Sequence, residues 1–169
     1  NLWMGTFHSV FARILREEAD KLGYPRNFTI YDTQDSNRLV SSIIKEMELD
    51  KDIYKFKQIK NRISAFKNSL ITVKAYFKDS ELQEADAMSR RPKVGEIYKE
   101  YVDRCFKAGA MDFDDLLLKT NELLNMYPEV LAKYQNRFRY IMVDEYQDTN
   151  HSQYLIVRAL SDKFQNICV

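Results

Sequence analysis

The chain has 169 residues, 45% of them hydrophobic, so it is long enough for one compact domain or for one domain with a large insertion. Tyrosine (11) and phenylalanine (10) are common, whereas glycine (4) and proline (3) are scarce, which favours helices and excludes a disordered chain or a turn-rich sandwich. The net charge of +1 does not by itself indicate a nucleic-acid partner, so evidence for such a partner must be local.

Two further features indicate the compartment of the protein. Its cysteines, Cys105 and Cys168, lie far apart and form no zinc-binding pattern, which is typical of a protein in a reducing compartment. No apolar run approaches the roughly 18 residues of a membrane span, and the N-terminus has no signal-peptide pattern. We therefore expect a cytoplasmic protein with no membrane partner.

The N-terminal residues predict a strand, a turn and a helix. Residues 2–6 form a short apolar run, which predicts the strand. From Phe7 onward the apolar residues recur with helical spacing, and Gly23 stands where a left-handed residue would end the helix.

The middle of the chain predicts mainly helices. Residues 27–31 predict a brief extended segment, and Asp32 or Thr33 can cap the helix that follows. Pro92 is expected in the first turn of a later helix that Gly109 ends. The helical stripes contain Leu39, Val40, Ile43, Ile44 and Met47, then Phe56, Ile59, Ile63, Phe66 and Leu70, then Val94, Ile97, Tyr98, Tyr101, Val102, Cys105 and Phe106.

Two buried strands are predicted near the C-terminus. Residues 140–143 form a continuous apolar run that ends abruptly at Asp144, which is typical of a strand buried on both faces. Residues 166–169 predict a second such strand, and residues 151–160 predict a helix between the two. We expect these strands and segment 2–6 to form one parallel sheet, with Asp144 and the end of segment 2–6 at the same carboxyl edge.

The chain is therefore expected to be α/β at both ends and helical in the middle. It contains no repeat, low-complexity segment or flexible linker, so the helical block is predicted to be an insertion rather than a tethered domain. We expect residues 1–22 and 110–169 to form the α/β domain and residues 23–109 to form the helical insertion.

The sharpest local signal is the pair Asp144 and Glu145. In parallel-sheet nucleotide-binding folds, ligands lie beyond the carboxyl ends of the strands, so two acids there can meet a phosphate-bound magnesium ion. Asp144 would bind the metal, directly or through water, and Glu145 could polarise the attacking water. Two acids after an apolar run also occur at ordinary solvated strand ends, so this pattern alone leaves both interpretations open.

Three short sequence blocks follow one another along the chain. They are Thr6-Phe7-His8-Ser9, then Asp112-Phe113-Asp114-Asp115-Leu116, then Asp144-Glu145-Tyr146-Gln147-Asp148-Thr149-Asn150. In this order, and with a helical insertion between the first two, they resemble superfamily 1 helicases of the UvrD/Rep/PcrA group. The resemblance extends over almost the whole chain. The resemblance implies an incomplete RecA-like (P-loop NTPase) sheet from motor domain 1A, with subdomain 1B as the insertion. For the acids of the second block we prefer helix capping to catalysis.

The resemblance also implies roles for single residues near the nucleotide. Asp144 and Glu145 would be the Walker B element, which serves Mg²⁺ and ATP hydrolysis. Gln147 matches a family position near the nucleotide. Asp148 or Asn150 can instead cap the helix that begins near residue 151.

The first block would lie on the track of single-stranded DNA. The resemblance assigns DNA contact to Thr6 and His8, and with them to Phe7 and Ser9. This is chemically sensible, because hydroxyl and imidazole groups can bond phosphate and an aromatic ring can stack on a base. Without the resemblance, His8 is equally well explained as a helix-capping or core histidine.

A basic stretch in the insertion is a second candidate for DNA contact. No acidic residue occurs between Ile53 and Lys78. Lys57, Lys60 and Lys67 lie on one flank of the apolar stripe, where they either face DNA or cover the core with their stems. The seven cations of the stretch are Lys55, Lys57, Lys60, Arg62, Lys67, Lys74 and Lys78.

The phosphate-cradling motif G-x-x-x-x-G-K-[ST] is absent, because none of the four glycines precedes a lysine. By the resemblance, the parent enzyme couples Mg²⁺-dependent ATP hydrolysis to translocation on single-stranded DNA and to unwinding at single-strand/duplex junctions, as in DNA repair. A fragment without the phosphate loop is expected to be inactive alone and to hold no cofactor tightly. Two alternatives stay open: a helicase-nuclease subunit of the RecB/AddA kind, and a non-catalytic helical binding domain.

Overall fold

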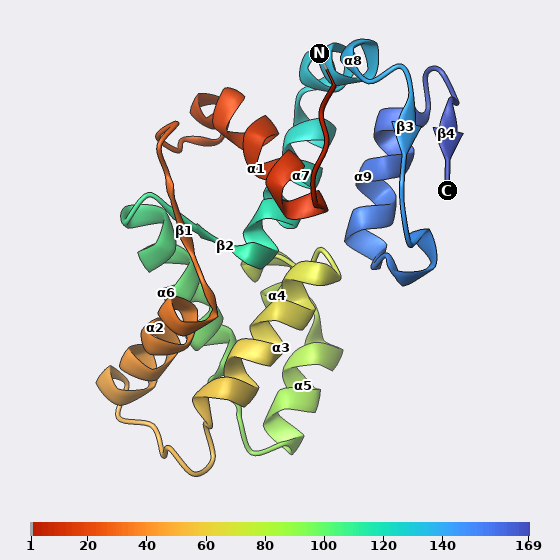
Figure 1. Cartoon of the computed structure of the whole chain (residues 1–169). Helices are drawn as coiled ribbons and strands as arrows, with labels where there is room; N and C mark the ends of the chain where they lie inside the picture. The colour runs from red at the N-terminus through yellow and green to blue at the C-terminus, as the bar shows by residue number, and fades with distance from the viewer. Residues whose placement is uncertain (1) are drawn as a thin grey trace. The chain divides into compact units, whose positions relative to one another are not determined.

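A computed structural model describes residues 2–169, which divide into two compact units. The α/β unit comprises the chain up to Arg26 and from Asp115 onward, and the helical unit comprises Asn27–Asp114 (Figure 1). The helical unit is thus close in extent to the expected insertion, residues 23–109. The assignment of the two units to motor subdomains stays a prediction.

The helical unit begins with a capped helix. Asp32 accepts a hydrogen bond from the backbone N–H of Asp35, and the Asp35 side chain accepts one in return, so the two form a capping box as expected. Gly109 (φ 60°) follows the last helix of the unit, as predicted, but Pro92 precedes that helix instead of lying in its first turn. The elements are β1 (Thr29–Tyr31), α2 (Thr33–Glu46), α3 (Phe56–Asn68), α4 (Val73–Lys78), α5 (Ser80–Met88), α6 (Val94–Lys107) and β2 (Ala110–Asp112).

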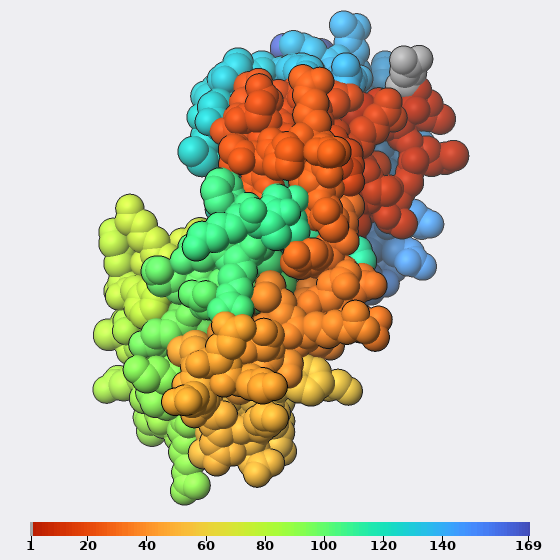
Figure 2. Space-filling model, turned by 90° about the vertical axis from the view of Figure 1, so that its left-hand side faces the viewer, coloured from red at the N-terminus to blue at the C-terminus, as the bar shows by residue number. Residues whose placement is uncertain are grey.

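The apolar stripes of this unit converge on one hydrophobic core. Helices α2 and α6 pack together, and Figure 2 shows them side by side. The expected stripes are confirmed except at Phe56 and Phe106, which are 38% and 50% exposed, and at Leu70, which lies beyond the end of α3. The burial of these side chains stabilises the unit by removing apolar surface from water. The core includes Val40, Ile43, Ile44, Ile59, Ile63, Phe66, Tyr76, Ile97, Tyr98 and Tyr101.

A small parallel sheet joins the two ends of the helical unit. β1 pairs with β2, with Thr29 opposite Ala110 and Tyr31 opposite Asp112. The extended segment at 27–31 is therefore confirmed, whereas β2 was not expected. Three residues between a helix-ending glycine and the next helix carry too little pattern to indicate a strand.

The α/β unit contains four helices longer than one turn among the residues that the structure describes. Gly23 adopts the predicted left-handed conformation (φ 77°), but it ends the short 3₁₀ helix of residues 19–22, whereas the first α-helix already ends at Glu17. The elements are α1 (Phe7–Glu17), η1 (Ala19–Leu22), α7 (Phe113–Met126, whose first two residues belong to the helical unit), α8 (Pro128–Arg137), β3 (Ile141–Met142), η2 (Tyr146–Asp148), α9 (His151–Ser161) and β4 (Ile167–Cys168).

The sheet of the α/β unit is smaller and more exposed than expected. β3 and β4 pair in parallel, with Ile141 opposite Ile167, so the predicted parallel order of these two strands is confirmed. The expectation of a strand buried on both faces is wrong, because Tyr140 and Met142 are 81% and 83% exposed. A two-stranded sheet with two residue pairs has too little area around it to cover both faces.

Residues 2–6 do not form the third strand that the apolar run predicted. Their backbone is irregular and pairs with neither strand of the unit. The apolar character of the segment is used differently: the Trp3 indole packs edge-on against the rings of Phe138 (centroids 5.0 Å apart) and Tyr134 (6.3 Å). The structure is therefore a helix-dominated α/β chain with small parallel sheets, and a RecA-like sheet stays a prediction.

Candidate functional site

The acidic pair lies in the loop between β3 and α9. Val143 donates its N–H to the carbonyl of Cys168 (2.8 Å), and the chain then leaves the sheet at its carboxyl edge. Asp144 and Glu145 follow at once, and both side chains are exposed. Glu145 has a left-handed backbone (φ 51°), and its N–H donates to Oδ1 of Asp144 (3.0 Å). The two carboxylates are thus displayed together at the edge where parallel sheets bind ligands.

The rest of this loop is held by its own hydrogen bonds. The N–H of Asp148 donates to the carbonyl of Glu145 (2.9 Å), and the hydroxyl of Thr149 donates to the backbone carbonyl of Tyr146 (2.8 Å). Asn150 then caps α9 through a capping box with Gln153, which confirms one of the two caps proposed from the sequence. Both ends of the acidic loop are therefore anchored.

The α9 end of the loop is also fixed from α7. Asn121 is buried, and its Nδ2 donates to Oγ (2.9 Å) and to the backbone carbonyl (3.2 Å) of Ser152, a residue with 0% exposure. A buried amide that makes these bonds holds one relative position of the two helices, because any shift would leave polar groups unsatisfied. The polar pair Asn121 and Ser152 gave no sign of this role in the sequence.

The donor set of the loop fits part of a magnesium-nucleotide site. Mg²⁺ is commonly held by one or two carboxylates together with phosphate oxygens and water, and Asp144 and Glu145 can supply such carboxylates. The described residues contain no cluster of three or more His, Cys, Asp or Glu side chains that could hold a metal ion alone. The nucleotide phosphates would therefore have to complete the coordination. Gln147 is exposed on the same loop.

The Thr6–Ser9 block forms the beginning of α1. Thr6 is the N-cap: its Oγ1 accepts from the N–H of Ser9 (3.3 Å), while the Ser9 hydroxyl donates to the Thr6 carbonyl (2.9 Å). Thr6 and Ser9 are exposed, and His8 is half-buried. The half-buried ring of Phe7 packs against Phe11, with centroids 5.7 Å apart. The block therefore has a structural role in capping, and the start of an 11-residue helix also favours an anion such as phosphate.

The acidic loop and the Thr6–Ser9 block lie toward the same end of the α/β unit. In Figure 1 the start of α1 and the loop between β3 and α9 are both at the end away from α8. They do not share a sheet edge, since residues 2–6 are not a strand.

Lys60 and Lys67 do not lie on a surface that DNA could reach. They are 8% and 1% exposed, so for these two residues the structure corrects the interpretation as DNA contacts. Lys57 is exposed, as are Lys55, Lys74 and Lys78. The candidate basic surface is therefore smaller than the sequence indicated.

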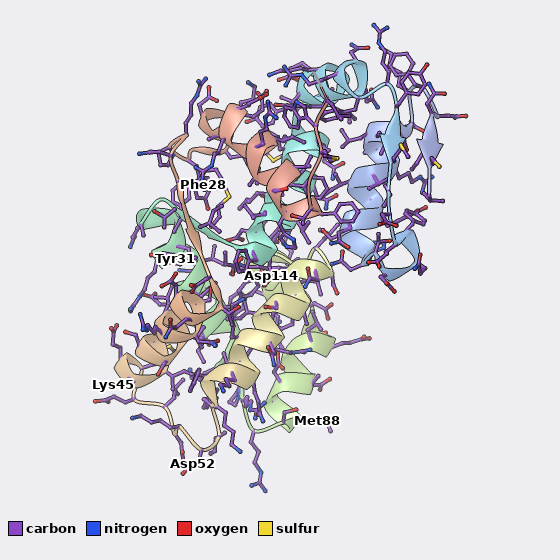
Figure 3. All side chains as sticks on the ribbon, viewed as in Figure 1. Phe28, Tyr31, Lys45, Asp52, Met88 and Asp114 are labelled. Carbon is purple, nitrogen blue, oxygen red and sulfur yellow. The ribbon has the colours of Figure 1, made fainter. Side chains whose placement is uncertain are left out.

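The buried lysines belong to a charged network inside the helical unit. Nζ of Lys67 lies 3.0 Å from Oδ2 of Asp112, which also accepts from the hydroxyl of Tyr101 (2.7 Å). Nζ of Lys60 lies 3.4 Å from the same oxygen and 3.1 Å from Oδ2 of Asp114. Figure 3 shows Asp114 where α7 begins, beside α3. Each buried ammonium group therefore has a carboxylate partner.

The electrostatics of Asp112 follow from this arrangement. Burial by itself raises the pKa of its carboxyl, but Lys67, Lys60 and the hydrogen bond from Tyr101 outweigh that effect, so the pKa lies well below its usual value. For Tyr101, burial and the nearby Asp112 charge raise the pKa of the phenol. Asp112 is thus ionised and stabilises the helical unit through these partners. Capping of α7 by Asp112 stays a prediction.

The sequence contained no local sign of this network. Lys67 and Asp112 are 45 positions apart, and Lys60 and Asp114 are 54 apart. Pairs at such separations form only through the fold, so the stretch without acids is equally consistent with a DNA-facing surface and with side chains that cover the core. The closely spaced acids Asp112 and Asp114 do not by themselves show where their partners lie.

Comparisons with known proteins agree on one family. A family model for the UvrD/REP helicase N-terminal domain matches residues 1–169. The ATP-dependent DNA helicase PcrA of Bacillus subtilis (strain 168) is 40% identical over 169 residues, which cover 100% of this chain. The proteins of the same name from Staphylococcus epidermidis (strain ATCC 12228 / FDA PCI 1200) and Staphylococcus aureus (strain NCTC 8325 / PS 47) are 41% identical over 168 residues, or 99% of this chain. The chain spans 22% of the length of each of these relatives.

No helix of the described residues is both long and apolar enough to cross a membrane.

Proposed function

The chain belongs to the UvrD/REP helicase N-terminal domain family, and from this premise we propose that it is part of the motor of an ATP-dependent DNA helicase. The parent enzyme couples ATP hydrolysis to translocation on single-stranded DNA and to unwinding of duplexes. We place it in the cytoplasm and in DNA repair. The observation that carries the proposal is the display of Asp144 and Glu145 at the carboxyl edge of a parallel strand pair.

The two acids have different roles in this proposal. Asp144 holds Mg²⁺, which neutralises charge on the nucleotide phosphates when bound. Its Oδ1 accepts the N–H of Glu145, which orients the carboxylate. Glu145 accepts a hydrogen bond from the attacking water, orients it and receives its proton, and Gln147 lies near the nucleotide.

The DNA contacts in this proposal come from both units. Thr6 and His8 at the start of α1 contact the single strand, with Phe7 available for stacking and Ser9 supporting the turn. Lys57 adds an exposed cation in the helical unit. Because the chain has no phosphate-cradling loop, it is not expected to hydrolyse ATP alone or to hold the nucleotide tightly.

The role of Asp144 is tested by its magnesium dependence. Asp144→Asn in the longer protein should shift the magnesium midpoint of ATP hydrolysis upward by at least about 10-fold, because the ion loses a charged ligand. DNA-stimulated ATP hydrolysis, measured across a magnesium series, gives the midpoint. Asp162→Asn removes an exposed carboxylate at the end of α9 and should leave the midpoint unchanged. A normal midpoint in Asp144→Asn would refute metal binding at this residue.

A further inference from the structure

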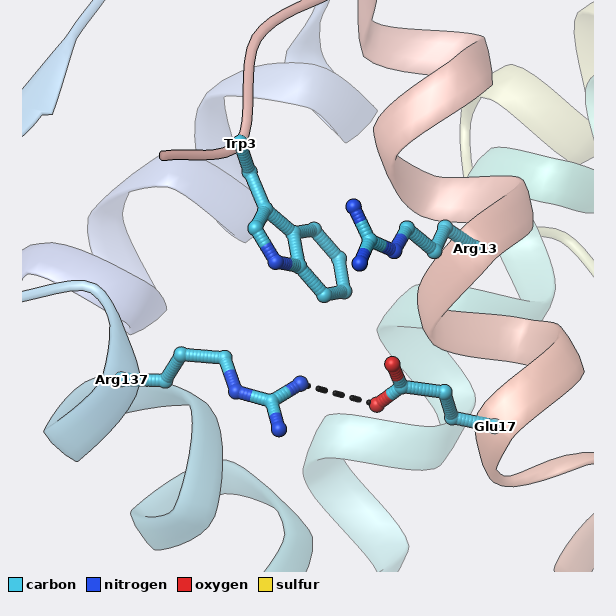
Figure 4. A pocket seen from close by; sticks show the side chains of 4 residues that line it. All are labelled: Trp3, Arg13, Glu17 and Arg137. Atoms are coloured by element: carbon cyan, nitrogen blue, oxygen red, sulfur yellow. Dashed lines mark hydrogen bonds and ion pairs between the residues drawn. The ribbon is translucent and has the colours of Figure 1, made fainter. Parts of the chain in front are cut away.

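A shallow pocket in the α/β unit is lined by Trp3, Arg13, Glu17 and Arg137 (Figure 4), and none of these residues belongs to the proposed nucleotide or DNA site. The pocket has a volume of about 280 Å³. Its walls come from the segment before α1, from α1 and from the end of α8, which are distant in sequence and meet only in the fold.

Two guanidinium groups lie against one indole in this pocket. The guanidinium carbon of Arg13 lies 3.9 Å from the centroid of the Trp3 ring, and that of Arg137 lies 5.4 Å from it. Stacking of this kind fixes the plane of a guanidinium group and leaves the N–H groups at its edge free to donate. Arg13 is therefore held in place without using its hydrogen-bonding capacity.

Among the described residues that line the pocket, Glu17 supplies the one carboxylate, and one of its two oxygens is already engaged. Oε2 of Glu17 accepts from Nη1 of Arg137 (2.9 Å) and from the hydroxyl of Tyr134 (2.7 Å). Burial tends to raise the pKa of Glu17, but these hydrogen bonds outweigh burial and lower it, so the carboxylate is ionised. The negative charge of Glu17 is balanced by Arg137, and Nζ of Lys133 lies 4.0 Å from the same oxygen, Oε2.

Arg13 differs from its neighbours because no carboxylate or carbonyl among the described residues pairs with it. Nearby Glu18 is paired with Lys133 and Lys21, so it does not supply the missing anion. The pocket therefore carries one uncompensated positive charge. It offers donors from Arg13, the remaining nitrogens of Arg137 and the indole N–H of Trp3, so the described lining has two guanidinium groups against the single carboxylate of Glu17.

We propose that this pocket binds a phosphate group, with Arg13 as the principal ligand and Arg137 as the second. A planar guanidinium group binds two oxygens of a tetrahedral oxyanion through parallel N–H bonds, which makes phosphate the matching chemistry. Arg13 lies over the Trp3 ring (3.9 Å) and Arg137 is within cation–π range of it (5.4 Å), so recognition depends on charge and hydrogen bonds instead of base stacking. The phosphate can be free or can belong to a nucleic acid. The proposal does not depend on the helicase function.

Trp3 is the only tryptophan of the chain, so one signal reports on the pocket. Inorganic phosphate is titrated at constant ionic strength while the fluorescence of Trp3 and its single indole N–H cross-peak in a ¹⁵N–¹H NMR spectrum are recorded. Both signals should change saturably with one midpoint. The NMR spectrum also shows that each variant is folded.

Two charge-matched variants decide the outcome. Arg13→Gln removes no hydrogen bond that the structure describes and should raise the phosphate midpoint at least about 10-fold, because a charge-assisted bond contributes that much or more to affinity. Arg158→Gln removes an exposed arginine from α9 in the same unit and should leave the midpoint unchanged. A linear response to phosphate, an equal response to chloride, or an unchanged midpoint in Arg13→Gln would overturn the proposal.

The source of the phosphate is distinguished by adding oligothymidylate with and without a 5′-phosphate. If backbone phosphates bind, both oligonucleotides shift the indole cross-peak and compete with inorganic phosphate. If the pocket binds terminal phosphates, only the oligonucleotide with a 5′-phosphate shifts the cross-peak and competes with inorganic phosphate. If neither competes, the pocket takes free phosphate. Each of these results supports a phosphate site and identifies what occupies it.

Discussion

The helical unit and the α/β unit use their acidic residues in opposite ways. In the helical unit, Asp112 is 1% exposed and its carboxylate accepts bonds from Lys67 and Tyr101. In the α/β unit, Asp144 and Glu145 are exposed, and no described cation pairs with either of them. A carboxylate whose partners come from its own chain stabilises the fold, whereas one left at a sheet edge is available for a ligand.

This difference separates residues that sequence alone places in one class. Lys57, Lys60 and Lys67 belong to one basic stretch, yet only Lys57 remains at the surface. The contrast therefore predicts stability effects for the buried charges and functional effects for the exposed ones.

Removal of the Asp112 charge should have the largest effect. Asp112→Asn takes one carboxylate partner away from Lys67, which is 1% exposed, and removal of one member of a buried ion pair typically costs about 3–5 kcal/mol. Urea unfolding of the chain measures the loss. Asp103→Asn breaks an exposed pair with Lys99 and should cost less than about 1 kcal/mol. Equal losses in the two variants would mean that the buried network contributes no more than a surface pair.

Asn121→Ala should have the next largest effect, about 1–3 kcal/mol, because it leaves the buried hydroxyl of Ser152 without its donor. Asn125→Ala changes an exposed residue one turn further along α7 and should alter the free energy of unfolding by less than about 0.5 kcal/mol. Both are measured by urea unfolding. If Asn121→Ala were as stable as Asn125→Ala, the bond to Ser152 would not anchor α9.

The stability of the helical unit should also depend on acid. The pKa of Asp112 is lower in the folded than in the unfolded chain, so its contribution is fully present above the unfolded value of about 3.9 and is lost as the pH falls below it. Unfolding free energies measured between pH 6 and pH 3, as rough limits around that value, should fall more steeply for the native chain than for Asp112→Asn. Parallel curves would show that another group controls the acid sensitivity.

The smallest change is expected at Lys57. Lys57→Gln should reduce the slope of DNA affinity against salt concentration by about 1 and weaken binding modestly, since one phosphate contact is lost. The free energy of unfolding should stay within about 0.5 kcal/mol of the native value, because the side chain is exposed. An unchanged salt slope in the longer protein would remove Lys57 from the DNA surface.

Local patterns predicted the parts of the fold that depend on neighbouring residues. The left-handed conformation of Gly23, the capping box at Asp32 and the cap at Asn150 are all confirmed, because each depends on residues within one turn. Residues 2–6 show where this approach fails. Their apolar character predicted a strand, but the Trp3 indole packs on the rings of Tyr134 and Phe138, which lie more than 130 positions away.

The candidate site was predictable to a similar extent. The apolar run at residues 140–143 predicted that Asp144 and Glu145 follow a parallel strand, and this position is confirmed. The left-handed backbone at Glu145 and the bond from Asn121 to Ser152 could not be foreseen, because both depend on contacts made after the chain has folded. The catalytic and DNA-contact roles stay predictions.

The most direct test of this account is ATP turnover by Glu145→Gln in the longer protein. The substitution keeps size and polarity but removes the charge and the proton-accepting oxygen. DNA-stimulated kcat should fall at least about 100-fold, or about 2.7 kcal/mol of barrier, while the Kd for ATP stays within a few fold. A near-normal kcat would contradict the catalytic assignment and leave the acidic pair as an ordinary strand boundary.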